Sequence, residues 1–327
     1  MSVKMRVDVK VRKLRFKSTY VYFCVYTPET VKIKYRVAFI GSPVCDTLAF
    51  NQLCRDMAGK GCLCVSIDLP GFGNSSVMAE QTNAYRAQII WGILDDVDFG
   101  RNEDLGKWHL VSHGSSCGTV LEMTRTQPNS VLSRTLIAPV SHRFGFTSHE
   151  YRMSGLRKWF YRQVYNYYIE DRGRFNDKLK TVFGYELPRE RADKLYEQFS
   201  SPGFLETMIK LLENGFYINE GAFDVKGPLI LIYGSRDPFR ADTYAMVRAL
   251  DDPERAHGHR LDQPLENYQR KREYMEVHQL PAGHVPMGDK YKTQQADKDA
   301  TFNAAIMQFL LGLMMELDGT VKTVKKK

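Results

Sequence analysis

Short apolar segments that alternate with helical stretches limit the possible folds of this chain more than any other feature. Five such segments run through the sequence, at Cys62–Ile67, Trp108–Val111, Thr135–Ala138, Leu229–Tyr233 and Met275–Leu280. Apolar strands of this kind are typical of sheets that are buried on both faces. Because helical stretches separate them, the pattern predicts a mostly parallel sheet with helices on both sides, which is the α/β class.

The first forty residues show a different β pattern. Between Val3 and Arg12 apolar residues alternate strictly with polar, mostly charged residues, which predicts a strand with one wet, basic face. Further β-rich stretches cover residues 20–26 and 31–40. At the other end of the chain, residues 297–317 are predicted to form a final helix.

The net charge of +8 is concentrated at the two ends of the chain. Residues 1–17 carry seven basic groups and one acid, and residues 322–327 carry four lysines. These ends account for more than the whole net charge, so the body of the protein is close to neutral. The basic ends suit an acidic partner such as RNA, an acidic protein or an anionic membrane surface.

Composition excludes several classes of protein. A chain with 43% hydrophobic and 12% aromatic residues can bury a large core, so global disorder is excluded. The longest apolar run, residues 304–315, is too short for a membrane span. Six cysteines without C-x-x-C spacing indicate free thiols in a reducing compartment. We therefore expect a cytoplasmic protein, with the mitochondrion as the second choice.

One helical segment interrupts the alternation of strands and helices. Residues 141–222 hold a large share of the aromatic residues and no strand pattern. We therefore expect a core in two parts, residues 1–140 and 223–327, with a helical cap insertion at 141–222 and a basic tail at the end. The aromatic residues suit either a helical core or a lid over an apolar pocket.

Five loops that follow predicted strands carry the residue types of nucleophilic catalysis. The early ones are Gly41-Ser42-Pro43, Asp68-Leu69-Pro70-Gly71-Phe72-Gly73-Asn74-Ser75 and His113-Gly114-Ser115-Ser116-Cys117-Gly118; the late ones are Gly234-Ser235-Arg236-Asp237 and Ala282-Gly283-His284. Serine, aspartate and histidine therefore follow one another along the chain, each at the end of a strand.

These loops resemble the motifs of the α/β-hydrolase family. The resemblance covers roughly residues 31–317, and its most specific parts are the D-x-P-G-F-G-x-S stretch at 68–75, the G-x-x-D at 234–237 and the A-G-H at 282–284. It implies a mostly parallel eight-stranded sheet with a helical cap after the sixth strand. It also implies a serine hydrolase that cleaves an ester, thioester, lipid or amide through an acyl-enzyme, without metal or cofactor.

The resemblance also assigns roles to individual residues. A serine hydroxyl is a poor nucleophile near neutral pH and needs a base within about 3 Å. The family pattern makes His284 this base and Asp237 the acid that orients it. It places the oxyanion hole at the N–H of Ser42 and at the N–H that follows the nucleophile. The histidine that usually precedes the first of these loops is replaced by Ile40.

The nucleophile can be placed in two registers. Residues 114–118 fit G-x-S-x-G, which makes Ser116 the nucleophile and Cys117 N–H the second oxyanion donor. The alignment without gaps instead puts Gly114, which has no hydroxyl, in the slot of the nucleophile. A third arrangement lets Ser115 or Ser116 reach His284 from a shifted position.

Two function classes follow from these registers. The first is a serine hydrolase that acts on a small acyl substrate. The second is a catalytically inactive relative that uses the same scaffold to bind or assemble with a partner. Asp237 and His284 favour the first class, whereas Gly114 and Ile40 favour the second.

Overall fold

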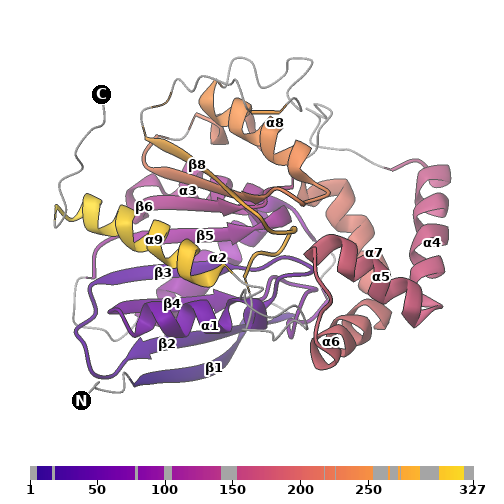
Figure 1. Ribbon diagram of the computed structural model, residues 1–327, viewed down its shortest axis with the longest axis horizontal. Helices are drawn as coiled ribbons and strands as arrows, with labels where there is room; N and C mark the ends of the chain where they lie inside the picture. Colours follow the sequence, from indigo (N-terminus) through magenta and orange to yellow (C-terminus); the bar gives the residue numbers. More distant parts are fainter. Residues whose placement is uncertain are drawn as a thin grey trace.

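The computed structural model describes residues 6–16, 19–77, 80–98, 105–140, 153–216, 218–224, 226–252, 264–265, 272, 274–287 and 302–319. At its centre lies one eight-stranded sheet (Figure 1). The strands are β1 (Val7–Phe16), β2 (Thr19–Pro28), β3 (Tyr35–Ile40), β4 (Cys62–Ile67), β5 (Trp108–His113), β6 (Val131–Ile137), β7 (Leu229–Gly234) and β8 (Met275–Leu280). Their order across the sheet is β1-β2-β4-β3-β5-β6-β7-β8.

The sheet is parallel from β4 to β8. The antiparallel pairs are β1 with β2, which form a hairpin, and β2 with β4. Every residue of β4, β5 and β7 is buried, as expected for strands that helices cover on both faces. The α/β class and the mostly parallel eight-stranded sheet are therefore confirmed.

Two layers of helices cover the sheet. On one face, α1 (Thr47–Ala58) and α9 (Asn303–Leu317) pack side by side. Their buried residues form one apolar cluster with the side chains on that side of the strands, for example Phe50 and Leu310 with Phe39. The other face is covered by α2 (Asn83–Asp98), α3 (Cys117–Thr126) and α8 (Arg240–Asp251). The alternating apolar strands and helices of the sequence thus form a three-layer core.

The first strand agrees with its sequence pattern from Val7 to Arg12. The alternation predicted a strand at residues 3–12, of which residues 3–5 lie outside the described residues. Strand β1 covers Val7–Phe16 and pairs along its full length with β2. Because β1 is an edge strand, its apolar face is only partly covered, and Val11 remains 58% exposed.

Helices fill the connection between β6 and β7. They are α4 (Gly155–Ile169), α5 (Arg172–Phe183), α6 (Arg189–Ser200) and α7 (Phe204–Lys210), followed by the short turns Leu211–Gly215 and Glu220–Ala222. We call α4–α7 the helical insertion. Residues 141–152 lie outside the described residues, and the division into a two-part core and a cap stays a prediction. Among the described helices, none is both long and apolar enough to cross a membrane.

Candidate active site

His284 and Asp237 form a buried hydrogen-bonded pair at the carboxyl ends of β7 and β8. Their atoms Nδ1 and Oδ2 lie 3.0 Å apart, and the two residues are 3% and 0% exposed. The second carboxylate oxygen, Oδ1, accepts the N–H of Phe239 at 2.7 Å. With the Nδ1 proton directed at Asp237, Nε2 is the atom of His284 that is able to accept a proton.

Close backbone packing fixes this pair in place. A Cβ on Gly234 would lie 2.2 Å from the carbonyl oxygen of Gly283, and a Cβ on Gly283 would lie 2.1 Å from that of Phe183. Only glycine allows the acid loop, the histidine loop and the end of α5 to approach so closely. The N–H of His284 also donates to the carbonyl of Val182 at 2.8 Å. The G-x-x-D and A-G-H motifs therefore have a steric reason for their glycines.

The chain turns sharply from β5 into α3 at Gly114, which has φ +58°. This strand–turn–helix geometry is that of a nucleophile elbow. A Cβ built on Gly114 would lie 3.5 Å from Nε2 of His284 and 3.4 Å from Oγ of Ser42. Gly114 thus faces the base, as the alignment without gaps predicted, and it presents no hydroxyl there.

The hydroxyl of Ser116 lies among backbone groups. Its Oγ is 3.0 Å from the carbonyl oxygen of Ile40 and 2.7 Å from that of His113, and it accepts the N–H of His113 at 3.2 Å. In the described part of the chain, Ser116 makes no hydrogen bond with His284. The structure therefore places Ser116 as a brace between β3 and the elbow, away from the position expected of a nucleophile.

Ser115 is buried as well, with 6% of its surface exposed. Its Oγ finds no hydrogen-bond partner among the described residues. No hydrogen bond joins Ser115 to His284 there, so the shifted arrangement is not formed in this structure.

His113 links the elbow to the two loops beside it. Its Nε2 donates to the carbonyl of His284 at 2.9 Å, which leaves Nδ1 to accept the hydroxyl proton of Ser42 at 2.8 Å. Burial, and then the neighbouring His284, hold the pKa of His113 well below its ordinary value. His113 is therefore neutral and braces the elbow.

Both amides that were expected to form the oxyanion hole donate within their own loops. The N–H of Ser42 donates to the carbonyl of Cys45 at 2.8 Å. The N–H of Cys117 donates to the carbonyl of Gly114 in the first turn after the elbow. These hydrogen bonds remove the two expected donors, so the oxyanion hole predicted at Ser42 and Cys117 is not preformed.

The aspartate of the D-x-P-G-F-G-x-S stretch holds a turn. Asp68 accepts the N–H of Thr47 at 2.7 Å and the N–H of Asn74 at 2.9 Å. Burial, and then the nearby Asp46, raise the pKa of Asp68. The motif therefore joins the start of α1 to the loop after β4 and contributes no group to the pair of His284 and Asp237.

The helical insertion rests on loops at the same edge of the sheet. Arg191 of α6 forms a bidentate ion pair with Asp46, with N–O distances of 2.7 and 2.8 Å and both side chains buried. Asp46 also caps α1 by accepting the N–H groups of Leu48 and Ala49. Nearby, the amide of Gln198 donates to the carbonyl of Pro43.

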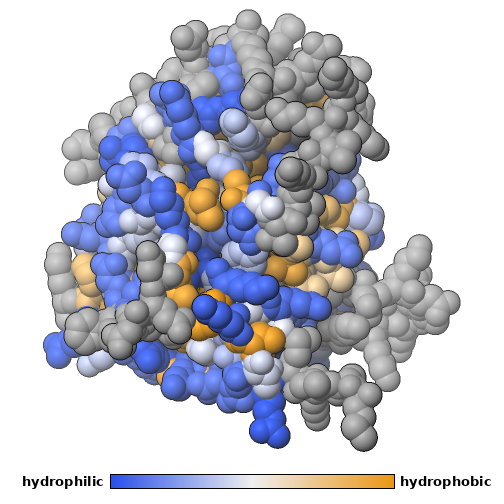
Figure 2. All heavy atoms as spheres, turned by 90° about the vertical axis from the view of Figure 1, so that its left-hand side faces the viewer, coloured by the Kyte–Doolittle hydropathy of each residue, from blue (hydrophilic) through white to orange (hydrophobic). Residues whose placement is uncertain are grey.

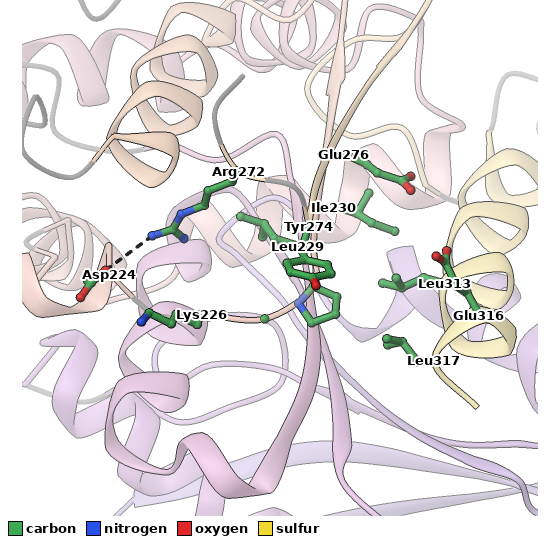
Figure 3. Close-up of a pocket in the computed structure, with 12 residues that line it drawn as sticks. Asp224, Lys226, Leu229, Ile230, Arg272, Tyr274, Glu276, Leu313, Glu316 and Leu317 are labelled. Atoms are coloured by element: carbon green, nitrogen blue, oxygen red, sulfur yellow. Dashed lines mark ion pairs between the residues drawn. The ribbon is translucent and has the colours of Figure 1, made fainter. Parts of the chain in front are cut away.

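A cavity of about 640 Å³ opens at the other end of the strands, where β7 and β8 begin (Figure 3). Apolar side chains of Leu229, Ile230 and Leu313 line its middle, and Arg272 pairs with Asp224 at one end at 3.9 Å. The amino ends of the strands lie on the left side of Figure 1. Figure 2 shows this side of the molecule, where hydrophilic residues predominate and apolar residues form separate patches. The cavity lies at the amino ends of β7 and β8, one strand length of roughly 20 Å from the histidine pair.

Comparison with solved structures identifies the architecture. A membrane phospholipase A described as a bacterial virulence factor superposes with a TM-score of 0.64 at 17% identity, covering 95% of this chain and 87% of that one. An epoxide hydrolase, CorEH, gives 0.65 at 9% identity, with 96% and 99% covered. This chain has the α/β-hydrolase fold. A thermophilic esterase from Thermogutta terrifontis gives 0.62 at 13% identity, with 94% and 99% covered.

These likenesses establish the fold and leave the activity open. No protein-family model matches the sequence, and no curated protein matches it. Within the α/β-hydrolase fold, the described residues place His284 and Asp237 together and bring neither Ser115 nor Ser116 to them.

One structural feature beside the site was not predicted from the sequence. The buried pair of Arg191 and Asp46 joins residues 145 positions apart. Asp46 before an apolar helical stretch is recognisable as a helix cap. Its arginine partner had no sequence signal, since α6 contains several other charged residues.

Proposed function

We propose that this protein is an α/β-hydrolase-fold protein that binds a small acyl-type molecule without forming an acyl-enzyme. The observation that carries this proposal is the position of Gly114 opposite Nε2 of His284. A serine hydrolase needs a hydroxyl at this point. The N–H of Ser42 supports the proposal, because it donates to the carbonyl of Cys45 and leaves a developing oxyanion without one expected donor.

The ligand class is suggested by solved structures with this fold, which include a phospholipase and an esterase. An ester, thioester, lipid or amide would lie at the carboxyl ends of β5, β7 and β8, beneath the helical insertion acting as a cap. Contacts of α5 and α6 with the loops of this edge support that placement. The neutral His113 and the buried Ser42 keep the elbow rigid around the ligand.

Labelling with a fluorophosphonate probe tests the proposal. We expect the wild-type protein to remain unlabelled, while calorimetry detects binding of an unreacted ester such as methyl octanoate. Stoichiometric labelling that disappears in Ser116→Ala would show that Ser116 is a nucleophile after all and would overturn the proposal. Labelling that persists in Ser116→Ala and disappears in Ser42→Ala or Ser115→Ala would overturn it in favour of that other serine.

A second candidate function is hydrolysis by water that His284 activates directly. The retained hydrogen bond between His284 and Asp237 favours it, since such a pair serves a base. This reaction would release p-nitrophenol from a p-nitrophenyl ester without an initial burst and would be lost in His284→Ala. Absence of turnover in the wild type would leave binding as the function.

Binding of an acidic partner through the basic ends stays a separate prediction. Strand β1 carries part of the basic segment, with Arg12 close to Asp96 at 3.3 Å. The lysines at 322–327 lie outside the described residues. Retention on an RNA or anionic-lipid surface that is sensitive to salt and lost on deleting residues 322–327 would support this interaction.

A further inference from the structure

The outward face of α4 exposes a row of large apolar side chains. Leu156, Phe160, Val164 and Tyr167 follow at steps of four, four and three residues, a spacing that puts them on one side of a helix. Their exposed fractions are 75, 62, 38 and 53%, and the neighbouring Trp159 is 56% exposed. Helices of soluble proteins usually turn such a row towards the core, so this one indicates an interaction surface.

Polar contacts on its other side hold α4 in this orientation. Lys158 pairs with the buried Glu213 at 2.8 Å, and Arg162 pairs with Glu206 at 2.6 Å. The hydroxyl of Tyr165 donates to the carbonyl of Phe199. The apolar row therefore faces outwards because the opposite side of α4 is anchored to α6, α7 and the turn after α7.

Basic residues lie at both ends of the apolar row. On α4, Lys158 and Arg162 belong to the anchored side, whereas the neighbouring α5 contains four basic residues and one acid. The guanidinium of Arg174 lies 4.2 Å from the ring centre of Tyr167, at one end of the row. Lys178 lies 5.8 Å from the ring centre of the adjacent Tyr168. The exposed Arg157 follows Leu156 at the other end.

We propose that this face of α4 docks on an anionic lipid surface. Large aromatic side chains with basic residues beside them are the features of helices that lie in the membrane–water interface. Basic groups beside the row attract anionic head groups. A second copy of the chain fits less well, because two such faces would bring basic rims together. Helix α4 also lies at the outer end of the molecule, beyond the carboxyl edge of the sheet (Figure 1).

Tryptophan fluorescence gives a direct readout on the whole protein. The chain has three tryptophans, and Trp91 and Trp108 are 5% and 2% exposed, whereas Trp159 is 56% exposed. On vesicles of phosphatidylcholine with phosphatidylglycerol, we expect the emission of Trp159 to shift to the blue and to become protected from iodide. Vesicles of phosphatidylcholine alone should bind less, and raised salt should weaken binding to the anionic vesicles.

The decisive variant is Phe160→Glu, which puts an acid in the middle of the row. We expect it to reduce co-sedimentation with anionic vesicles at least about tenfold. The matched control is Tyr274→Glu, at a side chain that is 68% exposed at the opposite edge of the sheet and should bind like the wild type. Absence of binding in the wild type, or equal binding by Phe160→Glu, would overturn the proposal. Self-association of the wild type that Phe160→Glu abolishes would overturn it in favour of a second copy.

Discussion

The proposed function depends most on Gly114, which lies at the turn where a serine hydrolase carries its nucleophile. Gly114 has φ +58°, and a side chain there would point at Nε2 of His284. Ser116, two residues later, fits the G-x-S-x-G motif, but its hydroxyl lies within hydrogen-bond distance of the carbonyl oxygens of Ile40 and His113. The turn at Gly114 therefore has the backbone geometry of a nucleophile elbow, but residue 114 has no hydroxyl.

His109, one of two buried histidines in β5, should make stability depend on pH. Burial lowers the pKa of His109 to about 4, whereas an unfolded histidine has a pKa near 6.5. Because the unfolded chain then binds the extra proton, the free energy of unfolding contributed by this residue is complete above about pH 6.5 and is lost as the pH falls towards 4. We expect His109→Gln to flatten the pH dependence measured by urea unfolding between pH 7 and 4.5. Parallel curves for variant and wild type would contradict this.

At the scale of elements, hydrogen bonds from the elbow hold β5 and α3 against β3. We expect Ser116→Ala to lower the free energy of unfolding by about 1–3 kcal/mol, because it leaves buried backbone groups without a partner. Urea denaturation measures this loss. The control is Ser201→Ala, at an exposed serine whose hydroxyl donates only to the carbonyl of Gln198, and it should change stability little. Equal effects of the two variants would show that Ser116 is no brace.

The docking of α6 depends on one buried ion pair. Arg191→Ala would leave Asp46 buried without its partner, so we expect a loss of about 3–5 kcal/mol in the free energy of unfolding. The matched control is Lys194→Ala, which breaks an exposed pair with Glu190 on the same helix and should cost about 0.5 kcal/mol or less. Chemical denaturation of both variants checks the difference. A small effect of Arg191→Ala would show that α6 is held by other contacts.

Sequence patterns predicted the bounds of two strands that are short and end in turns. The bounds predicted for β4 and β8 agree with the structure because both segments are short apolar or alternating runs that end in turns. The strand predicted at residues 3–12 overlaps β1 from Val7 to Arg12, and its residues 3–5 lie outside the described residues. For α4, the pattern could not tell an inward from an outward apolar face, because this depends on distant partners such as Glu213.

For the candidate site, the sequence predicted that the loops of Asp237 and His284 come together. It did not decide which residue occupies the position of the nucleophile. The pairing of His284 with Asp237 followed from the motifs. The motif could not decide whether Ser116 or Gly114 occupies the position of the nucleophile. The two registers differ by two residues, and only the conformation of the turn shows which residue faces His284. The expected oxyanion donors differ for a similar reason, since only the structure shows that Ser42 N–H donates to Cys45.

At the scale of the whole molecule, the sheet separates three regions. The histidine pair and the helical insertion lie at the carboxyl edge, and the cavity beside Arg272 lies at the amino edge. The apolar row of α4 faces outwards from the insertion. The fold is the α/β-hydrolase fold, and at its elbow Gly114 places no hydroxyl opposite Nε2 of His284.

The central claim is that residue 114 lacks the hydroxyl that a serine nucleophile would supply. Introducing a hydroxyl there tests this claim most directly. In Gly114→Ser the new Oγ can come within about 3 Å of Nε2 of His284, since a Cβ there lies 3.5 Å from it. The left-handed backbone costs about 1–2 kcal/mol for any side chain, so Gly114→Ala is the matched control.

The measurement is covalent labelling by a fluorophosphonate probe, followed by intact-mass analysis of folded protein and peptide mapping of the adduct. We expect no adduct on the wild type or on Gly114→Ala, one adduct on the introduced hydroxyl of Gly114→Ser, and none on Gly114→Ser combined with His284→Ala. An adduct on the wild-type protein, or folded Gly114→Ser that remains unlabelled, would contradict the central claim.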